Sequence, residues 1–323
     1  MRRRLLLRSL WFAPLLIIAL VIACGKKEAP AVASPGSPEE AVRASLLMLR
    51  DGQFDAYWRH SLPPADYRNL KADWPHREMA TDPVTTEERE RFIAGVKRLT
   101  DPDAEKKLFA DIRPKLVSYD KEYKDQMILI LGVFQSVALT AIDQAKDLSL
   151  SQKRQLREAM TIINPWAQTV PWGDQARAKA VIAILTETAR KLDLSTPEAL
   201  RSLDYDTSMA RYAIGWDGIK RALNVYGLSL DKSFDSVEIE TLETSDGSAH
   251  LKIRYTLLDK PMETDATMVL LDGHWYDSDV LQRVRDQHAR LNPPAPAAPA
   301  TVPAPAATVA SPVSAPVADA PRR

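Results

Sequence analysis

The chain has 323 residues, with 43 basic side chains, 43 acidic side chains and a single cysteine. Residues 1–23 hold four of the basic side chains and no acidic one, so the rest of the chain carries 39 basic and 43 acidic groups, a net charge of about −4. This balance argues against a nucleic-acid-binding protein, which would need a basic face to neutralise phosphates. With one cysteine the chain cannot form an internal disulfide, so we expect its stability to come from a packed core.

The first 24 residues have the pattern of an export signal. Residues 1–8 contain four arginines, and an uncharged, mostly apolar run follows at residues 9–23. This run is shorter than the ~20 residues that a membrane-spanning helix needs, and Pro14 interrupts it. The pattern therefore predicts a secretory signal rather than a permanent transmembrane anchor.

The end of this signal, Val21-Ile22-Ala23-Cys24, resembles the lipobox of bacterial lipoproteins. The resemblance implies that the chain is cleaved before Cys24, and that diacylglycerol and a further acyl chain such as palmitate are attached there. Two or more chains hold a protein stably to a membrane. By the same resemblance, Gly25 suits export to the periplasmic face of the outer membrane. The alternative is an ordinary signal peptide whose cleavage leaves Cys24 unmodified.

A flexible tether is predicted at residues 24–36, and a helical body at residues 37–235. The body begins with Ser37-Pro38-Glu39-Glu40, in which Ser37 and Glu40 can form a capping box and Pro38 suits the first helical position. This helix should end at Asp51-Gly52, and a short helix containing Phe54 should pack back on it. Residues 61–86 hold four prolines and are predicted to form a loop.

Further helices are predicted at residues 86–99 and after Asp101-Pro102, with Pro114 kinking or ending the second of these. Residues 120–148 form the most apolar helix. Because charged residues crowd both of its ends and Gln135 interrupts it, we interpret it as the central helix of a soluble bundle and not as a membrane span.

Helices are also predicted at residues 151–163, 174–192 and 208–226, with a short helix starting at Thr196-Pro197. The second of these should bury Ala180, Ile184 and Leu185. The segment 164–173 is predicted to be a loop in which Trp166 and Trp172 lie next to prolines. These tryptophans either form a rigid aromatic patch for a protein partner or glycan, or fill the ends of the helical bundle.

The period of the apolar residues changes from helical to alternating at residue 236. Leu251, Ile253, Tyr255 and Leu257 alternate with polar residues, which indicates strands with one wet face. Asp246-Gly247 and Asp272-Gly273 are hairpin signals, and Lys260-Pro261 is a third candidate turn. Residues 236–291 are therefore predicted to form an antiparallel β-meander of three or four strands with a closing helix at residues 279–291.

The predicted fold class is α+β, a mainly helical body with a small C-terminal antiparallel β-meander. Residues 292–323 follow it with nine prolines, eleven alanines and no aromatic residue. This segment cannot bury enough apolar surface to offset its ordering entropy, so we expect a disordered, partly polyproline II tail.

Two segments resemble envelope lipoproteins of the nuclear-transport-factor-two-like superfamily. One is Ser-Pro-Glu-Glu-Ala-Val at residues 37–42 followed by Asp-Gly-Gln-Phe at residues 51–54; the other is the hairpin at residues 270–276. The resemblance implies helices packed against a curved antiparallel sheet that serves as a binding scaffold and, in some members, as an enzyme. Here about 150 residues of predicted helix intervene, which the simple fold lacks.

The sequence contains no motif for a nucleophile elbow, a zinc helix, a phosphate loop or a calcium loop. The five histidines have no ligand spacing, and no cofactor or catalytic residue is predicted. We therefore expect a non-enzymatic binding or scaffold module, anchored to the membrane by lipid on Cys24, with the cell wall or an envelope protein as partner. The alternative is a periplasmic hydrolase whose site, with a buried histidine–carboxylate pair, lies in the cleft between helices and sheet.

Overall fold

A computed structural model of the chain describes residues 36–77, 83–145 and 148–293. The predicted signal peptide with Cys24, and nearly all of the tether and of the Pro/Ala-rich tail, lie outside these residues. The described part is mainly helical and carries one four-stranded antiparallel sheet near its C-terminal end, which confirms the predicted α+β fold class. No helix within the described ranges is long and apolar enough to cross a membrane.

The first described helix, α3 (Pro38–Arg50), begins with the predicted capping box. The Ser37 Oγ accepts a hydrogen bond from the Glu40 N–H at 3.3 Å, and the Glu40 carboxylate accepts one from the Ser37 N–H at 3.1 Å. Gly52 ends the turn with φ +70°, and α4 (Phe54–Ser61) packs back on α3 as predicted.

The predicted loop at residues 61–86 is wrong for its first part, where α5 (Pro64–Asp73) and the 3₁₀ helix η3 (Trp74–His76) form. Pro64 occupies the first helical position, where the missing N–H costs no hydrogen bond, so it starts a helix instead of preventing one. The next described helix, α7 (Thr86–Thr100), begins with a second capping box, made by Thr85 and Glu88.

Two prolines expected to disrupt helices lie inside them. Pro114 is within α8 (Ala104–Ser118), which continues into a short π-helical turn, η4 (Tyr119–Tyr123), and Pro165 is within α10 (Leu150–Thr169). The loop predicted at residues 164–173 is therefore wrong in its first half. Each proline removes one backbone hydrogen bond from its helix. Tertiary packing can outweigh this local cost, so both helices continue through the proline.

The helix α9 (Lys124–Gln144) is not the buried centre of a bundle, and that prediction is wrong. Leu129 is 70% exposed, Phe134 61% and Val137 60%, because α9 packs chiefly on α10 and no other described element covers its opposite side. A helix that is apolar on nearly all sides shows no preferred inner face, so its pattern could not indicate which side has neighbours.

Four helices complete the body: α11 (Gln175–Leu192), α12 (Pro197–Arg201), α13 (Tyr205–Val225) and α14 (Leu230–Asp235). The buried face of α11 differs from the predicted one by a shift of about two residues along the helix. The side chains that it buries are those of Ala178, Ile182 and Thr186, whereas Ala180 and Leu185 are exposed.

The sheet has the strand order β1-β2-β3-β4, with β1 (Glu238–Ser245), β2 (Ser248–Leu257), β3 (Lys260–Leu271) and β4 (His274–Asp277). The hairpins at Asp246-Gly247 and Asp272-Gly273 have positive φ at both residues, as predicted. The middle turn is made by Leu258 and Asp259, both with positive φ, and not by Lys260-Pro261, which pair with β2 inside strand β3.

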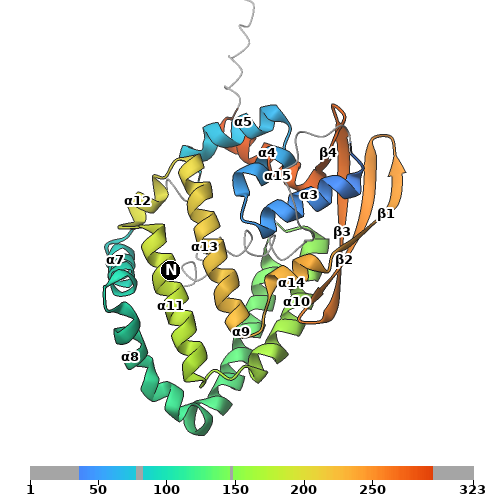
Figure 1. The fold of residues 1–323 in the computed structure, drawn as a ribbon. Coiled ribbons are helices and arrows are strands. Elements are labelled where there is room, and N and C mark those ends of the chain that lie inside the picture. Colours follow the sequence, from blue (N-terminus) through green and yellow to red (C-terminus); the bar gives the residue numbers. More distant parts are fainter. Residues whose placement is uncertain (1–35, 78–82, 146–147, 294–323) are drawn as a thin grey trace, which may run out of the picture.

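The alternation in β2 correctly identifies the buried face of the sheet. Leu251, Ile253, Tyr255 and Leu257 are all at most 3% exposed, and they form one core cluster with residues of α3 and α10. A second cluster joins α4, α5, α13, α14 and the closing helix α15 (Ser278–Leu291). Figure 1 shows the sheet along one side of the molecule, with α7, α8 and α11 on the other.

Candidate functional site

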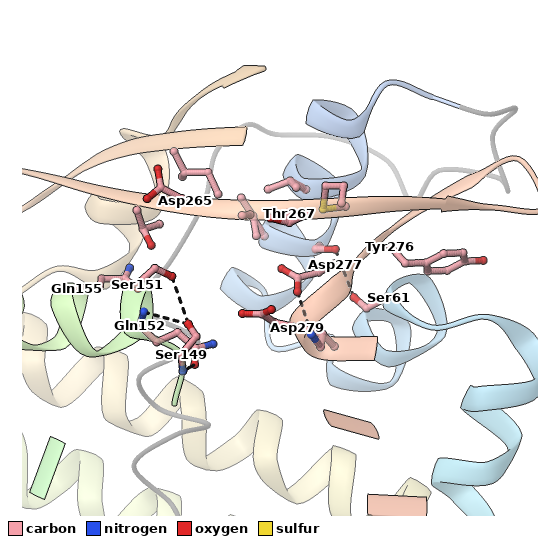
Figure 2. A pocket seen from close by; sticks show the side chains of 18 of the residues that line it. Ser61, Ser149, Ser151, Gln152, Gln155, Asp265, Thr267, Tyr276, Asp277 and Asp279 are labelled. Carbon is pink, nitrogen blue, oxygen red and sulfur yellow. Dashed lines mark hydrogen bonds between the residues drawn. The ribbon is translucent and has the colours of Figure 1, made fainter. Parts of the chain in front are cut away.

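A cavity of about 400 Å³ lies between the buried face of the sheet and the helices α3, α10 and α15. Its apolar wall includes Leu46 and Leu49 of α3 and Ile253 and Met268 of the sheet. Polar side chains face the same space from two directions, one group from α4, β4 and the start of α15, the other from the start of α10 (Figure 2). The cavity therefore combines an apolar wall with two sets of hydrogen-bonding groups.

The first group is centred on Asp277, the last residue of β4 and the N-cap of α15. Its Oδ1 accepts a hydrogen bond from the Val280 N–H at 2.9 Å. Burial raises the pKa of the Asp277 carboxyl, and the charge of Asp279 adds to this, whereas the Val280 amide and Arg283 act in the opposite direction. A carboxyl group in this environment holds a proton more tightly than one in water.

Three hydroxyl groups, those of Ser45, Tyr57 and Ser61, line the same cavity. The Ser45 and Ser61 Oγ atoms are 3.4 Å apart, and Ser61 also interacts with the hydroxyl of Tyr57. Burial raises the pKa of Tyr57 to about 12, with a further contribution from the nearby Asp277 charge. Tyr57 therefore stays a neutral phenol at physiological pH and can donate a hydrogen bond.

The second group comes from the amino-terminal turn of α10. Ser149 caps the helix and forms a capping box with Gln152, at 3.1 and 3.3 Å. One turn later, Gln155 donates from its Nε2 to the Tyr255 hydroxyl at 2.8 Å, and this bond ties α10 to strand β2. Asp265, on β3, lines the same end and pairs with Arg154 at 2.6 Å.

We expect the Asp277→Asn variant to gain stability relative to the wild type as the pH rises. Asparagine caps a helix about as well as aspartate, so the substitution removes the charge and keeps the cap. Because the folded pKa of Asp277 is above its unfolded value of about 3.9, its contribution to stability is complete below that pH and is lost as the pH rises through the folded pKa. Unfolding by urea across pH 3 to 8 measures this difference.

Asp204 provides the opposite control. Asp204 caps α13. The pKa of its carboxyl is lowered, chiefly by the hydrogen bond that the carboxylate accepts from the Thr207 N–H. For Asp204→Asn the stability relative to the wild type should therefore decrease as the pH rises from below the unfolded pKa. If Asp277→Asn instead lost stability relative to the wild type as the pH rises, as expected for Asp204→Asn, the raised pKa of Asp277 would be contradicted.

The predicted aromatic residues Trp166 and Trp172 are brought together, with ring centroids 6.4 Å apart. Both are half-buried. Their indole N–H groups donate to backbone carbonyls inside the fold, Trp166 to Tyr226 at 3.3 Å and Trp172 to Ala167 at 2.8 Å. Trp166 packs against the second core cluster, and neither ring lines the cavity beside the sheet.

A histidine–carboxylate pair does form, but at the junction of α5 and α15. The His288 Nδ1 lies 2.7 Å from the Asp73 Oδ2, and Asn292 donates to the Asp73 Oδ1 at 2.9 Å. Neither His288 nor Asp73 is among the residues that line the cavity, where the one described histidine is the exposed His250. No group of histidine, cysteine, aspartate and glutamate side chains suited to a metal ion occurs among the described residues.

Comparisons of the chain with protein-family models, with curated proteins and with solved structures found no match.

Proposed function

We propose that this protein is a cell-envelope lipoprotein, held through lipid on Cys24 to the periplasmic face of the outer membrane, that acts as a non-enzymatic binding or scaffold module. The lipobox-like end of the signal supports the anchor, since the sole cysteine stands at the position that this motif requires. The Pro/Ala-rich residues after 292 would extend from the body toward the cell wall or an envelope protein.

The cavity between sheet and helices supports the binding role. Its volume of about 400 Å³ falls within the range of roughly 300–1,000 Å³ typical of small-molecule sites, which combine apolar walls with a few polar groups. The neutral phenol of Tyr57 and the hydroxyls of Ser45 and Ser61 can donate or accept hydrogen bonds, and Asp277 adds a carboxyl group. We therefore propose as ligand a small molecule with an apolar part and hydroxyl or amide groups.

The hydrolase alternative would need a nucleophile held against a general base. The described contacts of Ser61 in the cavity are with Ser45 and Tyr57, and neither is such a base. The histidine–carboxylate pair of His288 and Asp73 lies elsewhere. These contacts favour binding over hydrolysis.

The anchor is tested by growing cells with labelled palmitate. We expect label in the wild-type protein and none in Cys24→Ser, because the thiol is the proposed attachment point. Label retained by the variant would show that the lipid is attached at another position, and an unlabelled wild type would contradict the anchor.

The cavity is tested by native mass spectrometry of protein purified from the envelope, which detects a small molecule that stays bound. Ala266 lines the cavity and lies opposite the buried Leu251 on the same face of the sheet, so Ala266→Trp should fill the space and weaken binding by at least about tenfold, which corresponds to ~1.4 kcal/mol. Thr244→Trp, at an exposed position of β1 outside the cavity, is the matched control. Equal occupancy in both variants would place the ligand elsewhere.

A further inference from the structure

A second, apolar cavity of about 510 Å³ lies between α8 and α11, two helices that Figure 1 shows on the side of the molecule away from the sheet. One wall is formed by Leu108, Ile112 and Leu116 of α8, and the opposite wall by residues of α11 that include Ile182 and Leu185. The side chain of Leu185 is 45% exposed, so this wall reaches the surface. Its volume is again that of a small-molecule site.

The two helices are fixed to each other near the beginning of α8. Ala104 is completely buried there, and the Thr186 hydroxyl of α11 donates to the Glu105 carboxylate at 3.2 Å. Arg190 contacts the same region twice, through Glu105 at 3.2 Å and the Asp101 carbonyl at 3.0 Å. These polar contacts hold α8 and α11 together beside the cavity.

The other end of α8 lies against the turn before α11. A Cβ at Gly173 would lie 3.1 Å from both the Leu116 carbonyl oxygen and the Tyr119 Cβ, so this turn lies directly against the end of α8. Trp172 and Tyr226 line the cavity here, with ring centroids 4.9 Å apart. Because the Trp172 N–H is already bonded to a backbone carbonyl, this residue contributes apolar surface to the wall.

One charged residue, Lys115, lines this apolar space. Its side chain is exposed, and among the described side chains it has no acidic partner within ion-pair distance. The neighbouring charges are engaged: Asp111 pairs with Arg98 at 2.6 Å, and the Lys179 ammonium lies over the Phe109 ring at 4.6 Å. An apolar cavity with a single cation at its edge is complementary to an apolar chain that ends in an anion.

We propose that the cavity between α8 and α11 binds a single-chain amphiphile with an anionic head, such as a fatty carboxylate. The alkyl chain lies between Ile112 and Leu185, and the carboxylate contacts Lys115. This site is separate from the cavity beside the sheet, and the proposal holds independently of the function proposed for that cavity.

The test measures binding of dodecanoate by calorimetry to a chain that begins at residue 24 and carries Cys24→Ser, which retains all described residues and lacks both the lipid and the apolar signal run. We expect one molecule per chain, and an affinity that rises by about fourfold per added methylene from octanoate to dodecanoate. Dodecyltrimethylammonium has the same chain with a cationic head. It should bind at least about fivefold more weakly, as expected for the gain or loss of one exposed ion pair.

Two substitutions locate the site. Lys115→Glu should reverse the preference between the anionic and the cationic amphiphile. Leu185→Glu places a charge in the apolar wall at a half-exposed position, so it should weaken binding of dodecanoate by at least about tenfold without unfolding the protein.

The matched control is Leu129→Glu on α9, an exposed leucine outside the cavity. Its affinity for dodecanoate should equal that of the parent protein. Binding lost in Leu129→Glu but retained in Leu185→Glu would overturn the proposal and place the amphiphile on the exposed face of α9. If the parent protein bound dodecanoate and dodecyltrimethylammonium equally well, the proposed contact between the carboxylate and Lys115 would be contradicted.

Discussion

Phe234→Ala is expected to lower the free energy of unfolding by about 3–5 kcal/mol, the usual cost of truncating a buried phenylalanine. Phe234 lies in α14, is 1% exposed and meets the Trp216 ring edge-on at 6.3 Å. Its removal leaves a void among α13, α14 and the neighbouring core, and rigid helices cannot close such a void completely. Urea denaturation followed by circular dichroism measures the loss.

The matched control is Phe134→Ala in α9, which makes the same chemical change at a side chain that is 61% exposed. We expect a change within about 0.5 kcal/mol, because little buried surface is lost. Comparable losses in the two variants would mean that α9 is covered in solution, by another copy or by a part of the chain outside the described residues.

Gly218→Ala is expected to destabilise the protein by about 1–3 kcal/mol, the range for overpacking a filled contact. A Cβ at Gly218 would lie 2.4 Å from the Thr188 Oγ1, 2.7 Å from its Cγ2 and 3.1 Å from its Cβ. Rotation of the threonine cannot relieve all three contacts, since β-branched side chains in helices have few allowed rotamers. The substitution therefore forces α11 and α13 apart.

Gly215 lies in the same helix, and a Cβ there would meet no atom within 4 Å. Gly215→Ala should raise the free energy of unfolding by up to about 1 kcal/mol, because alanine is the better helix former. The double variant Gly218→Ala with Thr188→Ala should recover most of the loss, because the crowding atoms are gone. A destabilised Gly215→Ala, or an unrescued double variant, would contradict this account of the α11–α13 contact.

Local features of the fold could be predicted from the sequence. The sheet follows from the alternation in β2 and from the Asp-Gly turns, since both signals are complete within a few residues. The start of α3 was predictable for the same reason, because Ser37 and Glu40 satisfy each other within one turn.

Features that depend on distant neighbours could not be predicted. The exposed face of α9 and the shifted buried face of α11 are decided by which helices pack beside them. A cleft between helices and sheet was named in the hydrolase alternative, but the residues of the candidate site could not be predicted for the same reason. Tyr57, Gln155 and Asp277 come from segments far apart in the chain, and before the fold is known none of them is distinguishable from a surface residue. The closing helix predicted at residues 279–291 begins one residue earlier, at Ser278, and this makes Asp277 its N-cap.

The core between α3 and the sheet joins the two ends of the described chain. The Glu39 carboxylate accepts a hydrogen bond from the Thr241 hydroxyl, across a separation of 202 residues. If the chain is exported from its amino terminus, α3 crosses the membrane first and the sheet that covers Val42 and Leu46 crosses nearly last. The apolar residues of α3 therefore stay exposed to water during most of the translocation. Contacts between residues so far apart in the chain also form slowly. This predicts a dependence on periplasmic holding chaperones during secretion.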